Sequence, residues 1–156
     1  MTRMKGLGLV AMVGVALLTA CGGDDDTAGT NGGTGDGGGG GGEPVEVTVA
    51  MTEFAFDPAT VTVGTGTEVT VTAENQGSVE HDFVVLDQGR EIAAETDLPE
   101  DLEEVRTEWA VVSLHTDAGA AETGTFTAPA AGDYQVICMV PGHFSAGMEG
   151  TLTVEG

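Results

Sequence analysis

Basic residues are nearly absent from this chain, which has four lysines and arginines against 26 acidic residues among 156. The net charge of −22 disfavours binding to nucleic acid or to an anionic lipid surface. Two of the four basic residues, Arg3 and Lys5, lie in an N-terminal leader, and without them two basic residues remain against 26 acidic ones, a net charge of −24. We therefore expect a protein partner to present a basic surface.

Cysteine and histidine are also scarce, with two and three copies. Two cysteines allow at most one disulfide, which excludes a scaffold held together by several disulfides. The histidines His81, His115 and His143 are too few to build several metal centres, and no recognisable Ser/His/Asp set or pair of catalytic carboxylates is present. The sequence therefore predicts a protein that is not an enzyme.

A run of about 20 apolar residues, as a membrane span requires, is missing as well. The apolar stretch from Gly6 to Ala20 has fifteen residues, follows a basic start and ends Leu-Thr-Ala directly before Cys21. Residues 1–20 are thus similar to a bacterial lipoprotein signal peptide, with lipid attached to Cys21 after cleavage. An ordinary secretory signal and an uncleaved anchor are the alternatives. The predicted location is the cell membrane, on the periplasmic or extracellular side.

Residues 21–42 contain glycine and aspartate and almost nothing apolar. This composition predicts a flexible tether with a root-mean-square reach of roughly 25 Å, to which a folded domain of residues 43–156 is attached.

The domain itself shows the two-residue hydrophobic period of half-buried strands. Valines alternate from Val45 to Val49, and Pro58 and Gly64 interrupt the pattern as turn residues do. The later candidate strands are 83–86, 109–114, 124–127, 134–138 and 151–154. An all-β, two-sheet antiparallel sandwich follows, for which roughly 110 residues suffice.

The segment from Cys138 to Met148 contains a cysteine, His143 and a methionine, with four residues between each pair. A thiolate, imidazoles and a weak thioether suit copper that changes between Cu(I) and Cu(II). The second imidazole that such a site requires is available at His81, which follows Asn75 and a short turn. The alternative for a lone cysteine is a buried core residue. Zinc is disfavoured, because methionine is a poor zinc ligand and no paired-cysteine spacing occurs.

These residues resemble the cupredoxins, the small blue copper proteins, and the four-and-four spacing is most similar to the rusticyanin, sulfocyanin and auracyanin branches. The resemblance covers roughly residues 45–156 and implies a Greek-key sandwich with one type 1 copper held by His81, Cys138, His143 and Met148. Many members have Asn directly after the first histidine, and this chain has Asp82. The support for the cysteine loop, and with it the reduction potential, therefore stays open.

An acidic insertion, residues 87–122, separates the first-histidine strand from the later strands. Within it, residues 97–105 predict a short helix with an N-cap, an early proline and acidic residues in its first turn. The insertion either shapes the rim of the copper site, docks a partner or is a solvated loop. We expect Trp109 to pack against the core or an edge, and His115 to lie at the surface.

Two functions remain. In the first, a membrane-tethered protein carries single electrons between redox partners outside the cytoplasm, of which a cytochrome or an oxidase domain with a basic surface is the expected kind. In the second, the protein binds copper for delivery, storage or sensing. A scarcity of histidines favours the first.

Overall fold

More buried and more exposed residues alternate along the strands, as β1 (Val45–Thr52) shows. The side chains of Val45 and Val47 are partly buried and that of Val49 is fully buried, and all three pack against the core, while Glu46 and Thr48 between them are exposed. This is the period of two that an extended strand with one buried face requires. The hydrophobic pattern thus places each strand with its apolar side toward the interior.

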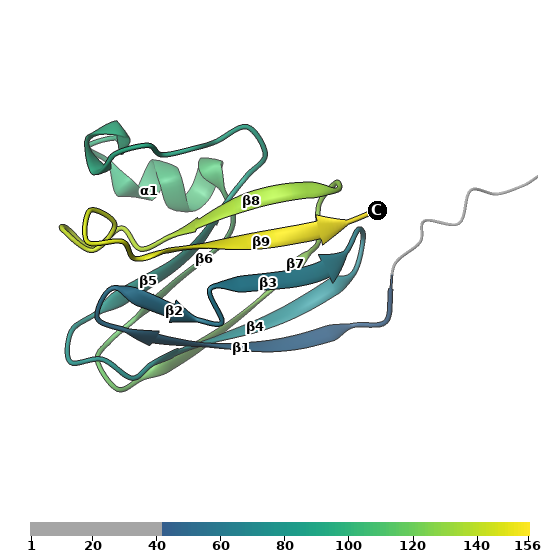
Figure 1. Ribbon diagram of the computed structural model, residues 1–156, viewed down its shortest axis with the longest axis horizontal. Coiled ribbons are helices and arrows are strands. Elements are labelled where there is room, and N and C mark those ends of the chain that lie inside the picture. The colour runs from purple at the N-terminus through teal and green to yellow at the C-terminus, as the bar shows by residue number, and fades with distance from the viewer. Residues whose placement is uncertain (1–41) are drawn as a thin grey trace, which may run out of the picture. The chain divides into compact units, whose positions relative to one another are not determined.

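The computed structural model describes residues 42–156, which form two β-sheets packed face to face (Figure 1). The four-stranded sheet has the order β2-β1-β4-β7, and the five-stranded sheet has the order β3-β9-β8-β5-β6. The remaining strands are β2 (Ala55–Asp57), β3 (Thr60–Gly64), β4 (Glu68–Asn75), β5 (His81–Leu86), β6 (Ala110–Thr116), β7 (Ala121–Thr127), β8 (Gly132–Ile137) and β9 (Glu149–Glu155). The all-β sandwich is confirmed.

The predicted signal peptide 1–20, the lipidation site Cys21 and the linker up to residue 41 lie outside the described residues. Within residues 42–156, no helix combines the length and the apolar character needed to cross a membrane.

The sequence predicts purely antiparallel sheets, but both sheets are mixed. β1 pairs with β4 in parallel, and β3 pairs with β9 in parallel, whereas the other pairings are antiparallel. Between β1 and β4 the chain passes through β2 and then joins the other sheet as β3, so it returns to β1 in the same direction. A period of two shows which face of a strand is buried, but it contains no information on the direction of the neighbour.

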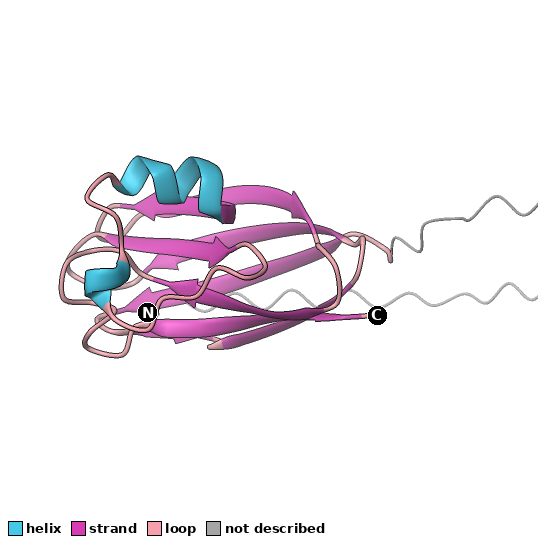
Figure 2. Ribbon diagram, turned by 90° about the horizontal axis from the view of Figure 1, so that it is seen from above, coloured by secondary structure: helices cyan, strands magenta, loops and turns pink. Residues whose placement is uncertain are grey.

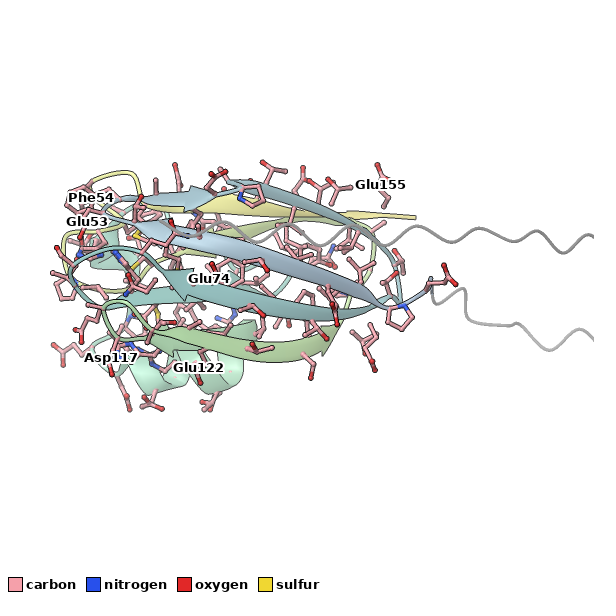
Figure 3. The ribbon with its side chains drawn as sticks, turned by 90° about the horizontal axis from the view of Figure 1, so that it is seen from below. Glu53, Phe54, Glu74, Asp117, Glu122 and Glu155 are labelled. Carbon is pink, nitrogen blue, oxygen red and sulfur yellow. The ribbon has the colours of Figure 1, made fainter. Side chains whose placement is uncertain are left out.

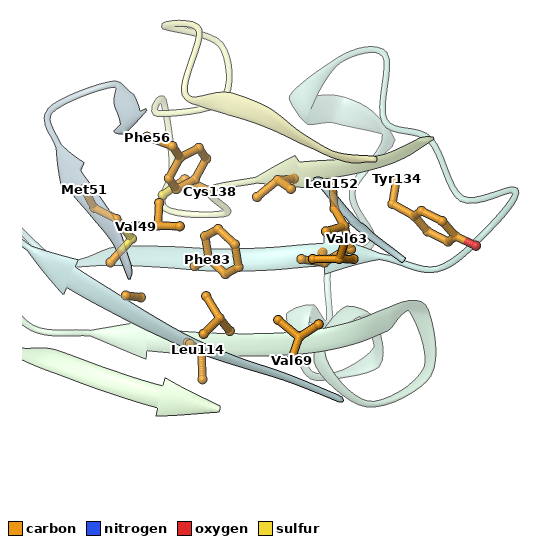
Figure 4. Close-up of a cluster of buried hydrophobic side chains, with 14 of the residues drawn as sticks. Val49, Met51, Phe56, Val63, Val69, Phe83, Leu114, Tyr134, Cys138 and Leu152 are labelled. Carbon is orange, nitrogen blue, oxygen red and sulfur yellow. The ribbon is translucent and has the colours of Figure 1, made fainter. Parts of the chain in front are cut away.

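The main hydrophobic core fills the space between the sheets (Figure 4). Phe56 and Phe83 meet edge to face at its centre, with ring centroids 5.6 Å apart. Cys138 and Met148 belong to this core and have no exposed surface. Met51 is also part of this core.

A second hydrophobic cluster lies on the outer face of the five-stranded sheet. Val84, Leu86 and Ile137 supply its sheet side, and Ile92 and Val105 of the insertion cover them. Met139 belongs to this cluster and not to the core that holds Cys138, because neighbouring side chains of an extended chain point to opposite faces. All six residues of β5 are consequently buried, because the insertion covers the face that would otherwise meet water.

The predicted helix of the insertion begins later than expected. A 3-10 turn, η1 (Glu95–Asp97), precedes α1 (Leu102–Glu104), which widens into a π-helical turn, η2 (Val105–Trp109) (Figure 2). The N-cap is Asp101, whose carboxylate accepts the N–H of Glu103.

Asp97, the first residue of the predicted helical segment, does not cap the helix, because its carboxylate accepts the N–H groups of Ala93 and Ala94 and closes the preceding turn. Trp109 packs against the second hydrophobic cluster, with the Arg90 guanidinium 4.6 Å from its ring centroid. The predicted packing role of Trp109 is therefore confirmed.

Candidate metal centre

Four side chains singled out in the sequence come from two neighbouring strands and the loop that follows one of them. His81 is the first residue of β5, and Cys138 directly follows β8, its antiparallel neighbour. The loop that begins at Cys138 contains His143 and ends at Met148, directly before β9. The sheet thus fixes His81 against the start of the loop.

Three of these side chains direct their metal-binding atoms at one buried point. The Nδ1 atoms of His81 and His143 are 3.1 Å apart, and the Sγ of Cys138 is 4.0 and 3.5 Å from them. A point in the plane of these atoms lies about 2.1 Å from all three, which matches the roughly 2.0–2.3 Å of bonds from imidazole and thiolate to zinc-sized metal ions. The donor set and its spacing fit a first-row transition metal.

Met148 closes the loop on itself. Its N–H donates to the carbonyl of His143 at 3.0 Å, and its carbonyl accepts the N–H of Cys138 at 3.3 Å. The side chain of Met148 is fully buried in the same core as Cys138. The two ends of the loop are therefore held together by backbone hydrogen bonds.

Burial sets the protonation of the centre. It lowers the pKa of His81, with a further decrease from the charge that His143 would carry, so the imidazole stays neutral as a metal ligand requires. Burial also raises the pKa of the Cys138 thiol, against a smaller opposing effect of the Asp82 N–H. The thiol is thus protonated before a metal binds, and binding releases that proton.

Asp82 links the centre to the outer face of the sheet. Its backbone N–H donates to the Sγ of Cys138 at 3.4 Å. Its carboxylate points away and accepts hydrogen bonds at one oxygen from Arg106 at 3.0 Å and from His115 at 2.9 Å. The hydrogen bond from the backbone to the cysteine sulfur thus forms although residue 82 is Asp and not Asn. Arg106, which holds the Asp82 carboxylate, was not identifiable from the sequence as a residue that supports the centre. His115 is half exposed, as expected, but belongs to β6.

Asn75 shapes the turn that leads to His81. Its side-chain amide donates to the carbonyls of Val79 and Thr116 at 2.8 and 3.0 Å, and its Oδ1 accepts the N–H of Gly77 at 2.9 Å. A Cβ on Gly77 would lie 2.8 Å from the Nε2 of His81, so this position requires glycine. The turn thereby fits tightly against the histidine.

Glu95 of the insertion holds the loop from outside. One carboxylate oxygen accepts the N–H of Gly142 at 2.7 Å, and the other accepts the hydroxyl of Ser145 at 2.5 Å. The Ser145 hydroxyl, followed by the Gly142 N–H, lowers the pKa of Glu95. The insertion therefore contributes to the rim of the centre, which was one of the three predicted roles. Nothing in the sequence distinguishes Glu95 from the other acidic residues.

His143 is the part of the centre that reaches the surface. It is 8% exposed, whereas His81 and Cys138 have no exposed surface. The ring of Phe54, itself 47% exposed, stands edge-on to the His143 ring at a centroid distance of 5.3 Å. Phe54 lies beside Glu53 at one end of the sandwich (Figure 3).

Residues 43–155 match the model of a family described as copper binding proteins, the plastocyanin/azurin family. The chain belongs to this family. The resemblance drawn from the sequence is therefore confirmed, and copper is the cofactor. The group formed by His81, Cys138, His143 and Met148 is typical of a type 1 copper site in this family.

Two curated proteins are similar to this chain over most of its folded domain. Auracyanin-B of Chloroflexus aurantiacus is 30% identical over 141 residues, which cover 81% of this chain and 58% of that protein. The copper-resistant cuproprotein CopI of Rubrivivax gelatinosus is 35% identical over 109 residues, covering 64% of this chain and 59% of CopI. The chain thus spans less than two thirds of the length of both relatives.

Among solved structures, the dithionite-reduced auracyanin of Roseiflexus castenholzii superimposes with a TM-score of 0.61 at 33% sequence identity. The match covers 74% of this chain and all of the auracyanin chain. The β-sandwich of this chain therefore has the same fold as a solved auracyanin structure.

Proposed function

We propose that this protein carries single electrons, with one copper ion bound by His81, Cys138 and His143 and with Met148 as a weak axial ligand. The observation that carries this proposal is the buried convergence of one cysteine sulfur and two imidazole Nδ1 atoms at the spacing of a metal site. Copper supplies the exchange between Cu(I) and Cu(II) in such a donor set.

The surrounding residues keep the ligands in place. The Asn75 turn positions His81, the Asp82 N–H points at the Cys138 sulfur, and the backbone bonds of Met148 close the loop. A hydrogen bond to a ligand sulfur stabilises negative charge on the thiolate. With the ligands already fixed by the protein, little has to move when one electron enters or leaves.

Electrons enter and leave, in this proposal, at the exposed edge of His143. The neighbouring Phe54 offers an apolar contact surface, and apolar aromatic residues are common at protein interfaces. The net charge of −22 favours a redox partner with a basic surface, such as a cytochrome or an oxidase domain. Lipid on Cys21 would keep the protein at a membrane outside the cytoplasm, and this part of the proposal rests on the leader sequence alone.

Copper handling is the second candidate, because a relative at 35% identity is named as a copper-resistant cuproprotein. A carrier for delivery or storage must release its ion, whereas an electron carrier must retain it in both oxidation states. Retention therefore separates the two functions.

The test is a visible absorption spectrum of the full chain with one equivalent of Cu(II), followed by ascorbate and reoxidation. An intense blue or green band that bleaches and returns while copper stays bound supports the electron carrier. A band that bleaches with loss of copper supports copper handling. A weakly coloured complex overturns the proposed ligand set.

A further inference from the structure

A second group of metal-binding side chains lies on the outer face of the β5–β6 pair. Asp82 and His115 are opposite each other in the antiparallel register, so their side chains share one face of the sheet. Glu80 directly precedes β5 and Asp117 directly follows β6, and the carboxylates of both come close to the His115 imidazole. Four polar side chains thus gather at this corner of the five-stranded sheet.

Three members of this group are near enough to bind one ion. The ligand atoms of Glu80, His115 and Asp117 all lie within 4.8 Å of one another, and the Nε2 of His115 is 3.8 Å from a carboxylate oxygen of Glu80. All three side chains are exposed. Figure 3 shows Asp117 at the same end of the molecule as Phe54. The group shares no residue with the copper centre, whose side chains face the interior.

Asp82 orients the imidazole of His115. Its carboxylate, only 3% exposed, is paired with Arg106 and lies 2.9 Å from the Nδ1 of His115. A carboxylate in an ion pair only accepts hydrogen bonds, so the Nδ1 of His115 donates to Asp82 and the Nε2 is directed toward Glu80, where a metal ion could replace its proton. An imidazole whose second nitrogen donates to a carboxylate is the arrangement found for metal-bound histidines.

The electrostatics of this corner favour a cation. Within the described residues, Arg106 pairs with Asp82 and Glu103, and no lysine or arginine forms an ion pair with Glu80 or Asp117. Two exposed carboxylates beside an imidazole carry uncompensated negative charge, in a chain of net charge −22. One imidazole and two carboxylates suit a borderline divalent ion such as Zn²⁺ or Cu²⁺, with water filling the remaining positions.

We propose that Glu80, His115 and Asp117 form a second, solvent-exposed binding site for a divalent transition-metal ion, with Asp82 as the residue that orients His115. The site is distinct from the copper centre in its ligands and in the face of the sheet that it occupies. Its ligands are exposed and it lacks a thiolate, so binding is reversible and selective for divalent ions over Cu(I).

The test is a calorimetric titration of the full chain with Zn²⁺ after the copper centre has been loaded and reduced. We expect one Zn²⁺ per chain. His115→Gln retains an amide donor for Asp82 but loses the imidazole, and Glu80→Gln loses one carboxylate, so each weakens zinc binding at least about tenfold. Glu122→Gln removes the same charge from an exposed position on β7, in the other sheet, and leaves the affinity within about twofold.

Equal affinities for all four proteins would overturn the proposal, because zinc would then be attracted only by the general negative charge. Several equivalents of zinc with no dependence on His115 would do the same. The thermal unfolding of each variant, measured without zinc, shows that a loss of binding is not a loss of fold. The outcome does not depend on whether the protein transfers electrons, because His115 does not belong to the copper centre.

Discussion

The backbone N–H of Asp82 in β5 donates a hydrogen bond of 3.4 Å to the sulfur of Cys138, the residue that follows the neighbouring strand β8. The carboxylate of the same aspartate is turned outward, toward Arg106 of the insertion. Asp82 therefore connects the metal-binding cysteine to the insertion, a segment to which the strand pattern assigns no structural role. We therefore expect a substitution of Arg106 to affect the centre through Asp82.

Replacing Arg106 by Met should destabilise the domain by about 1–3 kcal/mol, because the buried Asp82 carboxylate loses its cation. The measurement is urea unfolding. Arg90→Met is the matched control, since Arg90 contributes a cation–π contact to Trp109 of only about 0.5–1 kcal/mol. Equal losses in the two variants would show that the Asp82 ion pair has no special role.

Glu53 should make stability depend on pH in the acid range. The Ser78 N–H and hydroxyl lower the pKa of Glu53 from 4.5 to about 2. A carboxyl with a lowered pKa in the folded state stabilises the fold above its unfolded pKa, and this contribution is lost as pH falls toward the folded value. The free energy of unfolding of the unaltered protein should therefore be larger than that of Glu53→Gln above pH 4.5. This difference should disappear by about pH 2.

Unfolding curves of both proteins between pH 6 and pH 2 give the measurement. Glu46→Gln, at an exposed position of β1, is the control for the removal of one surface charge. A difference that stays constant with pH would contradict the assigned role of Ser78.

Cys138 and Met148 should have different effects on the visible spectrum of the copper centre. Cys138→Ser should abolish the intense thiolate-to-copper absorption, because an alcohol does not replace a thiolate as the strong ligand. Met148→Leu should retain that band and raise the reduction potential, because the thioether tunes the copper without producing the colour. Absorption and voltammetry of the two variants check this, and a lost band in Met148→Leu would contradict a weak axial role.

Glu95 should slow the release of copper. Glu95→Ala removes the acceptors of both the Gly142 N–H and the Ser145 hydroxyl, which should speed the transfer of copper to a competing chelator at least about fivefold, the equivalent of one hydrogen bond of about 1 kcal/mol. Glu91→Ala, at an exposed acid of the same insertion, is the control. If both variants release copper at the same rate, the insertion does not hold the loop.

The four proposed ligands could be found in the sequence because three lie in one short loop and the fourth follows a turn around Asn75. The strands could be found because valines alternate in them. The direction of β1 relative to β4 could not, since the pattern shows burial and not the partner. The contacts of Glu95 and Arg106 could not either, because 47 residues separate Glu95 from Gly142 and 24 separate Arg106 from Asp82. Acidic residues are too frequent here for one of them to signal such a contact.

β5 has no face in contact with water, since the core covers one side and the insertion the other. Its amide protons should accordingly be among the slowest to exchange with solvent, and opening there would require the sandwich itself to unfold. The Cys138–Met148 loop is held by a few hydrogen bonds at the rim. Any exchange of the metal with its surroundings would therefore proceed by fluctuation of that loop, while the strand that begins with His81 stays in place.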